Sequence, residues 1–366
     1  MHAGRAMTLL FGISEHFERL RGVPVHRQYE ERIRLVQRAE EHGFYGYHVS
    51  EHHNGPLCMA PSPIVFLSAL AQRTSTIRLG TLILILPTYS PLRLIEEICM
   101  LDQLSHGRFM PGIGRGVREI EHEWLGIDPT EARERFAELL EILRQGLRDH
   151  RIAFRGTHYR FDDLELAFEP FQSPKPPLWW AGNLETAAGY GMSVIGAPGP
   201  GMTRAKIEAY WEAFSEARGQ PHSQWVEHEP KVGSTRFVIV ADTDEAARAI
   251  ARRAWDVHAD NVWRIPFNVQ GRVSVRGTPG MNVGEDADLV MARNRALVVG
   301  APDTLREMLA EFIDEVGPGH NYLVAQLQWG DISHDEAMHS LDLYGTEVVP
   351  WLAARSNDVP APASVR

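Results

Sequence analysis

Short apolar runs alternate with longer amphipathic stretches along most of the chain. The runs are rich in branched and aromatic residues, and each is followed by a stretch whose apolar positions recur at helical spacing. The pattern predicts eight strands, over residues 8–13, 45–50, 77–86, 108–113, 177–182, 192–196, 234–241 and 321–328. It predicts helices over residues 29–42, 62–73, 91–104, 130–148, 184–190, 203–218, 244–263, 303–316 and 335–352.

Eight successive strand–helix units without a break in composition favour one closed α/β domain, a (β/α)8 TIM barrel with insertions, over residues 1–352. Residues 150–168 interrupt the rhythm and are predicted to form a β-hairpin. Residues 264–300 are irregular, and segments of this kind are usually lids or disordered loops. Residues 353–366, rich in proline, alanine and serine, are expected to form a flexible tail. In such a barrel, function is located where the strands end.

Composition narrows the possible partners and compartment. A formal charge of -11 over 366 residues opposes binding to a phosphate backbone, so nucleic acid is not expected. No apolar stretch approaches the roughly 20 residues of a membrane-spanning helix, so no membrane association is expected. Cys58 and Cys99 are too few for a disulfide framework, and no export signal is visible. Cytoplasmic residence is therefore expected.

The motif HVSEHHN, residues 48–54, follows the second predicted strand and places Glu51, His52 and His53 on the functional rim. Histidines there could cap the strand end, or His48, His52 and His53 could bind a metal. The spacing matches neither HExxH nor HxH. A single histidine that titrates near neutral pH as a general acid or base fits the motif better.

PGIGRGVRE, residues 111–119, follows the fourth predicted strand and is a poor dinucleotide-binding loop. Its third glycine, Gly116, comes one position early and Val117 stands in its place, so no nicotinamide site is indicated. The glycines still allow a flat ligand to approach the backbone closely. Arg115 supplies forked donors suited to phosphate, although it could equally pair with a carboxylate of the rim.

WWAGNLET, residues 179–186, leads from the fifth predicted strand into a helix. Asn183 is a plausible N-cap, and the amides of residues 182–185 with the hydroxyl of Thr186 could bind an anion. Ordinary capping would also explain Asn183. Because Arg115 follows the neighbouring strand, the cation and the helix start could converge on one phosphate.

In their order, EHHN, LGTLILILPTYSPLRLIEEICMLDQLSHGRFMPGIGRG, PLWWAGNLET and VGAPDTLREML resemble the bacterial luciferase-like flavin-dependent monooxygenases over about residues 8–352. The resemblance implies a barrel that binds reduced FMN supplied by a separate NAD(P)H-flavin reductase. In this family the reduced FMN reacts with O2 to give a flavin hydroperoxide, which oxygenates a small apolar organic substrate. It also implies a homodimer and no metal, and residues 264–300 coincide with the family's mobile active-site loop.

The resemblance assigns roles to particular residues of this sequence. His52 matches the active-site acid or base, and Glu51 matches a glutamate that contacts the flavin. Leu82 and Ile83 fall where the luciferase has a cis peptide against the flavin ring. The residues that match the phosphate site are Arg115, Gly182, Asn183 and Thr186.

Some positions depart from the light-emitting enzyme. Gly114 replaces its reactive cysteine, Gly182 and Asn183 replace its Glu-Ser pair, and GAPGPG stands in place of a Ser-Trp pair. Hydroxylation, epoxidation or Baeyer-Villiger oxygenation is therefore expected rather than light emission. Three alternatives remain open: a deazaflavin-dependent oxidoreductase of the same fold, a metal-dependent TIM-barrel hydrolase, and a non-catalytic flavin-binding subunit.

Overall fold

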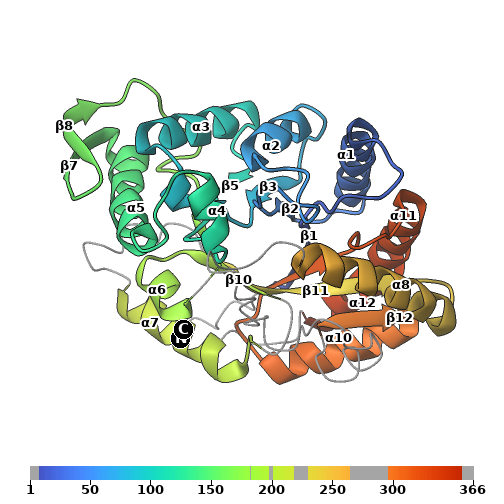
Figure 1. Cartoon of the computed structure of the whole chain (residues 1–366). Coiled ribbons are helices and arrows are strands. Elements are labelled where there is room, and N and C mark those ends of the chain that lie inside the picture. The colour runs from blue at the N-terminus through green and yellow to red at the C-terminus, as the bar shows by residue number, and fades with distance from the viewer. Residues whose placement is uncertain (1–7, 182, 198–200, 218–229, 264–295, 357–366) are drawn as a thin grey trace, which may run out of the picture.

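The computed structural model describes residues 8–181, 183–197, 201–217, 230–263 and 296–356. Figure 1 shows helices arranged around a central set of strands. The strands of the main sheet are all parallel to their neighbours. They are β1 (Leu10–Glu15), β2 (Gly46–Val49), β3 (Arg78–Thr81), β4 (Leu84–Ile85), β5 (Phe109–Met110), β6 (Gly112–Gly114), β9 (Trp179–Trp180), β10 (Ser193–Gly196), β11 (Val232–Val240), β12 (Leu297–Gly300) and β13 (Tyr322–Gln326).

The sheet closes on itself through two interrupted strands. β3 and β4 are successive parts of the third barrel strand, and β5 and β6 are successive parts of the fourth. β3 pairs with β5 and β4 pairs with β6, while the rest of the order runs from β6 through β9, β10, β11, β13, β1 and β2 to β3. The predicted (β/α)8 barrel is confirmed.

The helices begin and end close to the positions that the sequence predicts. Proline stands at the first position of α3 and α10, and Ser333 with Glu336 forms a capping box at the start of α11. The helices are α1 (Val25–Glu41), α2 (Pro63–Ala71), α3 (Pro91–Leu104), α4 (Glu119–Trp124), α5 (Ala132–Asp149), α6 (Leu184–Gly189), α7 (Arg204–Ala217), α8 (Asp244–Trp263), α10 (Pro302–Val316), α11 (His334–Leu343) and α12 (Val349–Ser356), with single turns at η1 (Leu86–Thr88) and η3 (Tyr344–Val348).

Three segments differ from or refine the expectations. Strands β7 (Arg151–Arg155) and β8 (Arg160–Glu165) pair antiparallel, within the segment where a hairpin was predicted. The segment 264–300, which was expected to be irregular, ends in strand β12. This strand pairs with the C-terminal part of β11, residues 237–240. Residues 264–295 lie outside the described residues. Helix α12 extends to Ser356, so residues 353–356 of the expected flexible tail are helical.

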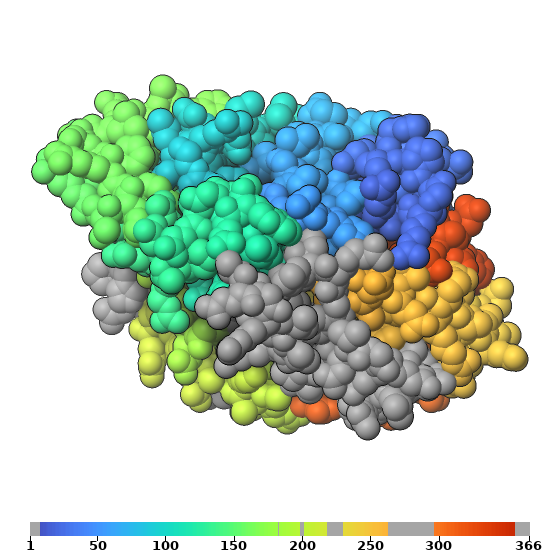
Figure 2. Space-filling model, in the orientation of Figure 1, coloured from blue at the N-terminus to red at the C-terminus, as the bar shows by residue number. Residues whose placement is uncertain are grey.

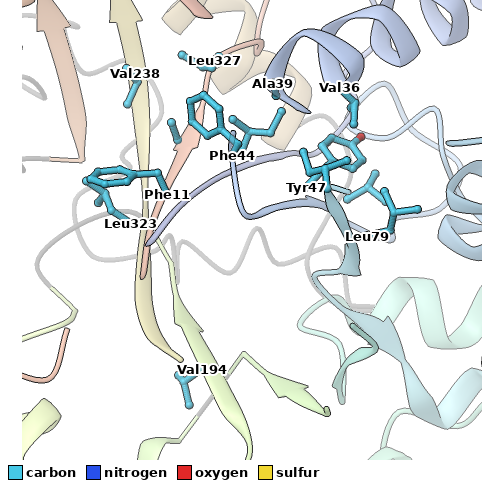
Figure 3. Close-up of a cluster of buried hydrophobic side chains, with 14 of the residues drawn as sticks. Phe11, Val36, Ala39, Phe44, Tyr47, Leu79, Val194, Val238, Leu323 and Leu327 are labelled. Carbon is cyan, nitrogen blue, oxygen red and sulfur yellow. The ribbon is translucent and has the colours of Figure 1, made fainter. Parts of the chain in front are cut away.

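Buried side chains form two layers. The larger one lies between the barrel and its helices; Figure 3 shows Tyr47 of β2 near Val36 of α1 within it. The smaller one joins Met110, Trp179, Ile195, Tyr322 and Val324, which come from the four strands β5, β9, β10 and β13. This second cluster fills the barrel interior, as in other barrels of this size. No described helix is long and apolar enough to cross a membrane.

Two glycines make room for polar rings inside the barrel. A Cβ atom on Gly80 would lie 2.2 Å from Nδ1 of His48, and one on Gly12 would lie 2.0 Å from the hydroxyl of Tyr322. These two rings form a hydrogen bond, with 3.0 Å between His48 Nε2 and the Tyr322 hydroxyl. The close approach explains why neither position carries a side chain.

Candidate active site

Glu51 is the fixed anchor of the loop that follows β2. One carboxylate oxygen accepts hydrogen bonds from the backbone N–H of Ile85, at 3.1 Å, and from the hydroxyl of Tyr89, at 2.8 Å. The other lies 3.0 Å from Nε2 of His53. Glu51 thus ties the β2 loop to the chain that follows the cis peptide, and it is buried. Burial lowers the pKa of His53, but its hydrogen bond with Glu51 and the charges of Glu51 and Glu121 raise it overall.

His52 is held by a carboxylate that the sequence did not single out. Its Nδ1 lies 3.1 Å from Oε1 of Glu121 on α4, and the same oxygen accepts the backbone N–H of His53 at 3.0 Å. The side chain of Glu121 is 1% exposed and that of His52 17%. A carboxylate at Nδ1 favours the tautomer that carries its proton there, which leaves the Nε2 of His52 able to accept a proton.

The stability of this arrangement should depend on pH. Burial raises the pKa of Glu121, but the hydrogen bond and charge of His52 outweigh it, together with the backbone N–H of His53 and the charge of Arg118. The net pKa lies below the ordinary 4.5. A carboxyl group with a lowered folded-state pKa stabilises the fold above its unfolded pKa, and this contribution is lost as pH falls through the folded value.

We therefore expect the free energies of unfolding of wild type and Glu121→Gln to differ at about pH 7 and to converge towards about pH 3. Denaturant titrations at a series of pH values measure the difference. Glu123→Gln, at an exposed position of the same helix, should change the unfolding free energy little. A difference in unfolding free energy between wild type and Glu121→Gln that is equally large at about pH 7 and about pH 3 would contradict the expectation.

The three histidines of the HVSEHHN motif have different partners. His48 lies inside the barrel, bound to Tyr322 and packed on Trp179, and burial lowers its pKa to about 3. His52 is bound to Glu121 and His53 to Glu51. Within the described ranges, no group of three or more His, Cys, Asp or Glu side chains is arranged to hold a metal ion. The metal-hydrolase alternative therefore finds no ligand set among these described residues.

The peptide between Leu82 and Ile83 is cis, as the resemblance implied. Both side chains are half-buried at the mouth of the barrel, where Leu82 packs on the inner cluster of Met110, Trp179 and Tyr322. A Cβ atom on Gly114 would lie 2.9 Å from the side chain of Ile83. The residue that replaces the luciferase's cysteine is thus covered closely by Ile83.

Arg115 and the start of α6 lie at the ends of neighbouring strands. β6 pairs with β9 through Ile113 and Trp180, two and three residues before Arg115 and Asn183, respectively. The guanidinium of Arg115 is exposed and forms no hydrogen bond or ion pair with any residue that the structure describes. The alternative in which Arg115 pairs with a rim carboxylate therefore finds no support among these residues.

Asn183 caps α6 as predicted. Its side-chain oxygen accepts the backbone N–H of Thr186 at 2.9 Å and lies 3.3 Å from the Thr186 hydroxyl. The side chains of Asn183 and Thr186 are exposed. They follow β9, whose neighbour β6 leads to Arg115. Gly182, the remaining residue assigned to the phosphate turn, lies outside the described residues.

A second polar group at the rim was not predicted. Glu18, after β1, is buried, and its two carboxylate oxygens bind Nδ1 of His258 at 2.6 Å and the amide of Asn261 at 2.8 Å. We call these three residues the Glu18 cluster. His258 and Asn261 belong to α8, and Figure 2 shows this segment, in gold, against the N-terminal part of the chain, in blue. His16 lies between the cluster and His52, with ring centroids 6.2 Å from His258 and 5.7 Å from His52.

Several curated relatives match most of this chain. An uncharacterized protein of Sinorhizobium fredii, y4wF, is 33% identical over 335 residues, which cover 91% of this chain and 94% of that protein. Limonene 1,2-monooxygenase of Rhodococcus erythropolis is 26% identical over 87% of this chain and 80% of its own length. The oxygenase component of the flavin-dependent trigonelline monooxygenase of Acinetobacter baylyi is 30% identical over 66% of this chain and 68% of its own length.

Solved structures share the fold. The oxygenating constituent of 3,6-diketocamphane monooxygenase from Pseudomonas putida, a Baeyer-Villiger enzyme in complex with FMN, superposes with a TM-score of 0.73 at 21% identity. The alignment covers 94% of this chain and 98% of that one. An F420-dependent secondary alcohol dehydrogenase has a TM-score of 0.68 at 17% identity, covering 94% and 99%. Residues 11–318 match the family model for luciferase-like monooxygenases, and the chain therefore belongs to that family.

Proposed function

We propose that this protein is the oxygenase component of a two-component flavin-dependent monooxygenase. It would take reduced FMN from a separate NAD(P)H-flavin reductase and use O2 to oxygenate a small apolar organic substrate, by hydroxylation, epoxidation or Baeyer-Villiger chemistry. The observation that carries the proposal is the order of groups around the mouth of the barrel. The His52–Glu121 pair, the Leu82–Ile83 peptide, Arg115, which has no side-chain partner among the described residues, and the Asn183 cap follow one another on adjacent strands.

The side chains at this mouth fit a flat ring with a phosphate tail. Arg115 offers a forked cation with no competing partner in the described part of the chain, and the capped start of α6 follows the next strand. Leu82 and Ile83 offer an apolar surface for a ring between Arg115 and His52. Reduced FMN, when bound there, supplies the electrons that activate O2.

The residues of the chain then have separate tasks. Arg115 with Asn183 and Thr186 would hold the phosphate, and the protonated Nδ1 of His52 is fixed by Glu121, so that Nε2 can take up or release a proton beside the ring. Both carboxylate oxygens of Glu51 are already bound to other residues of the protein. Glu51 would therefore support the flavin site by holding the β2 loop in place. The relative that acts as an oxygenase component supports the assignment of a separate reductase.

Two further expectations belong to the same proposal. We expect a homodimer in the cytoplasm. Apolar side chains are exposed on the adjacent helices α2 and α3, where Val65 is 70%, Met100 51% and Leu104 43% exposed. Sedimentation velocity of the wild type and of Val65→Glu would test the dimer, because a charge placed in such an interface should favour monomers.

A deazaflavin-dependent oxidoreductase is the second candidate, because an F420-dependent enzyme shares the fold. Anaerobic titration of the protein with reduced FMN and, separately, with reduced F420 distinguishes the two. We expect tighter binding of reduced FMN. With a flavin reductase added, substrates such as terpenes, ketones, aldehydes and aromatic polyketides should yield products that carry one atom from labelled O2. Tight binding of F420 alone, or products without label, would contradict the proposal.

A further inference from the structure

His16, which follows β1, lies at the rim without any hydrogen-bond partner in the described part of the chain. Its Nδ1 is buried and unpaired, although the ring as a whole is partly exposed. Nε2 is not among the buried unpaired atoms, so this is the edge of the ring that reaches the open side of the rim. A buried nitrogen with no partner destabilises the fold relative to an apolar ring of similar size. Packing alone therefore does not account for an imidazole here.

The rings of His16 and His52 stack, with an interplanar angle of 26°, but the two rings have opposite surroundings. His52 is paired with the Glu121 carboxylate. His16 faces positive or potentially positive groups: His52 from the β2 loop, His258 from α8, and Arg118 from the turn before α4. The carboxylate of Glu18, in its own loop, opposes them, but both of its oxygens are occupied by the Glu18 cluster.

These surroundings keep His16 neutral. Burial is the main cause that lowers its pKa, and the charges of His52, His258 and Arg118 lower it further, to about 3, despite the charge of Glu18. A neutral imidazole donates through one nitrogen and accepts through the other. Because a buried N–H without an acceptor is rarer than a buried unpaired acceptor, the tautomer with its proton on Nε2 is favoured. His16 then presents an N–H group towards the mouth of the barrel.

Two neighbouring imidazoles with opposite surroundings can take different roles in one site. We propose that His16 is a second functional imidazole of the site, which donates a hydrogen bond from Nε2 to an acceptor oxygen of the substrate, while His52 exchanges the proton. The proposal rests on the proposed function for its substrate, but the neutral state of His16 can be measured without any ligand. A hydrogen bond from His16 would restrict the substrates to apolar molecules that have an oxygen near this side chain, either before the reaction or once they have been oxygenated.

Two substitutions separate hydrogen bonding from packing. His16→Phe keeps a planar ring against His52 but removes both nitrogens, whereas His16→Gln places an amide donor near the position of Nε2. We expect kcat/KM for the substrate to fall about 10-fold in His16→Phe, the loss of one hydrogen bond of roughly 1.4 kcal/mol, and about 3-fold or less in His16→Gln. The affinity for reduced FMN should be unchanged in both.

Equal losses in the two variants, or full activity of His16→Phe, would overturn the proposal. Melting temperatures of both variants would show whether a loss reflects misfolding. Nitrogen-15 NMR of histidine-labelled protein, recorded without cofactor, provides the independent readout: His16 should remain a neutral Nε2–H tautomer from about pH 8 to about pH 5, while His52 keeps its proton on Nδ1. A His16 ring that gains a proton within that range would also overturn it, whether or not the protein binds FMN.

Discussion

Replacing His52 by asparagine is expected to lower the rate of product formation by about 10²–10⁴-fold, the usual contribution of a positioned acid or base. The amide nitrogen of asparagine takes the place of Nδ1 and can still donate a hydrogen bond to Glu121, so the loop after β2 should keep its shape. It cannot take up a proton, and this is the only property that the substitution is meant to remove. His52→Ala removes the hydrogen bond as well and should be at least as slow.

The measurement is single-turnover product formation with protein loaded with reduced FMN, which separates chemistry from cofactor supply. His26→Ala, at an exposed position of α1, is the control and should match the wild type. Binding of reduced FMN should change little in either His52 variant. If His52→Asn formed product within about threefold of the wild-type rate, proton exchange by His52 would have no place in the mechanism.

Replacing Arg115 by alanine should weaken the binding of reduced FMN by about 10–100-fold. A hydrogen bond between charged groups contributes roughly 1.5–3 kcal/mol, and each 1.4 kcal/mol is a factor of ten in affinity. Arg115→Lys should lie between alanine and wild type, because lysine keeps the charge but loses the forked geometry. Arg115 has no partner among the described residues, so its removal leaves no buried charge behind.

Riboflavin, which lacks the phosphate, provides the matched ligand control. Its affinity, measured by anaerobic titration, should be equal for wild type and Arg115→Ala. Arg93→Ala, which removes an exposed guanidinium on α3, should leave the affinity for both ligands unchanged. If riboflavin and FMN lost affinity by the same factor, Arg115 would act on the ring or on the fold, and the phosphate assignment would be wrong.

The barrel could be predicted because its signals are local. Each strand is a short apolar run, and helix α3 begins at a proline that both the sequence and the structure place at residue 91. Strand β12 was missed because LVVG is only four residues long and adjoins the segment whose sequence shows no regular pattern. Helix α4 was missed because EIEHEW is short and largely charged, although it carries Glu121.

The candidate site could be predicted only in part, for a physical reason. HVSEHHN identified the rim histidines, but nothing in the motif says which carboxylate each one meets. Glu121 lies 69 positions after His52, and His258 lies 240 positions after Glu18. Such pairs form only when the barrel brings distant loops and helices together, and single charged residues are too common in the sequence to be recognised one by one.

The Glu18 cluster also constrains how proteins of this fold can be recombined. Glu18 is buried directly after β1, and both of its oxygens are bound by residues of α8. A chimera that received α8 from a distant homologue lacking these donors would leave an uncompensated carboxylate inside the molecule, at a cost of about 3–5 kcal/mol. Transplanting that helix therefore requires exchanging the first loop with it, although 240 positions separate Glu18 from His258 along the chain.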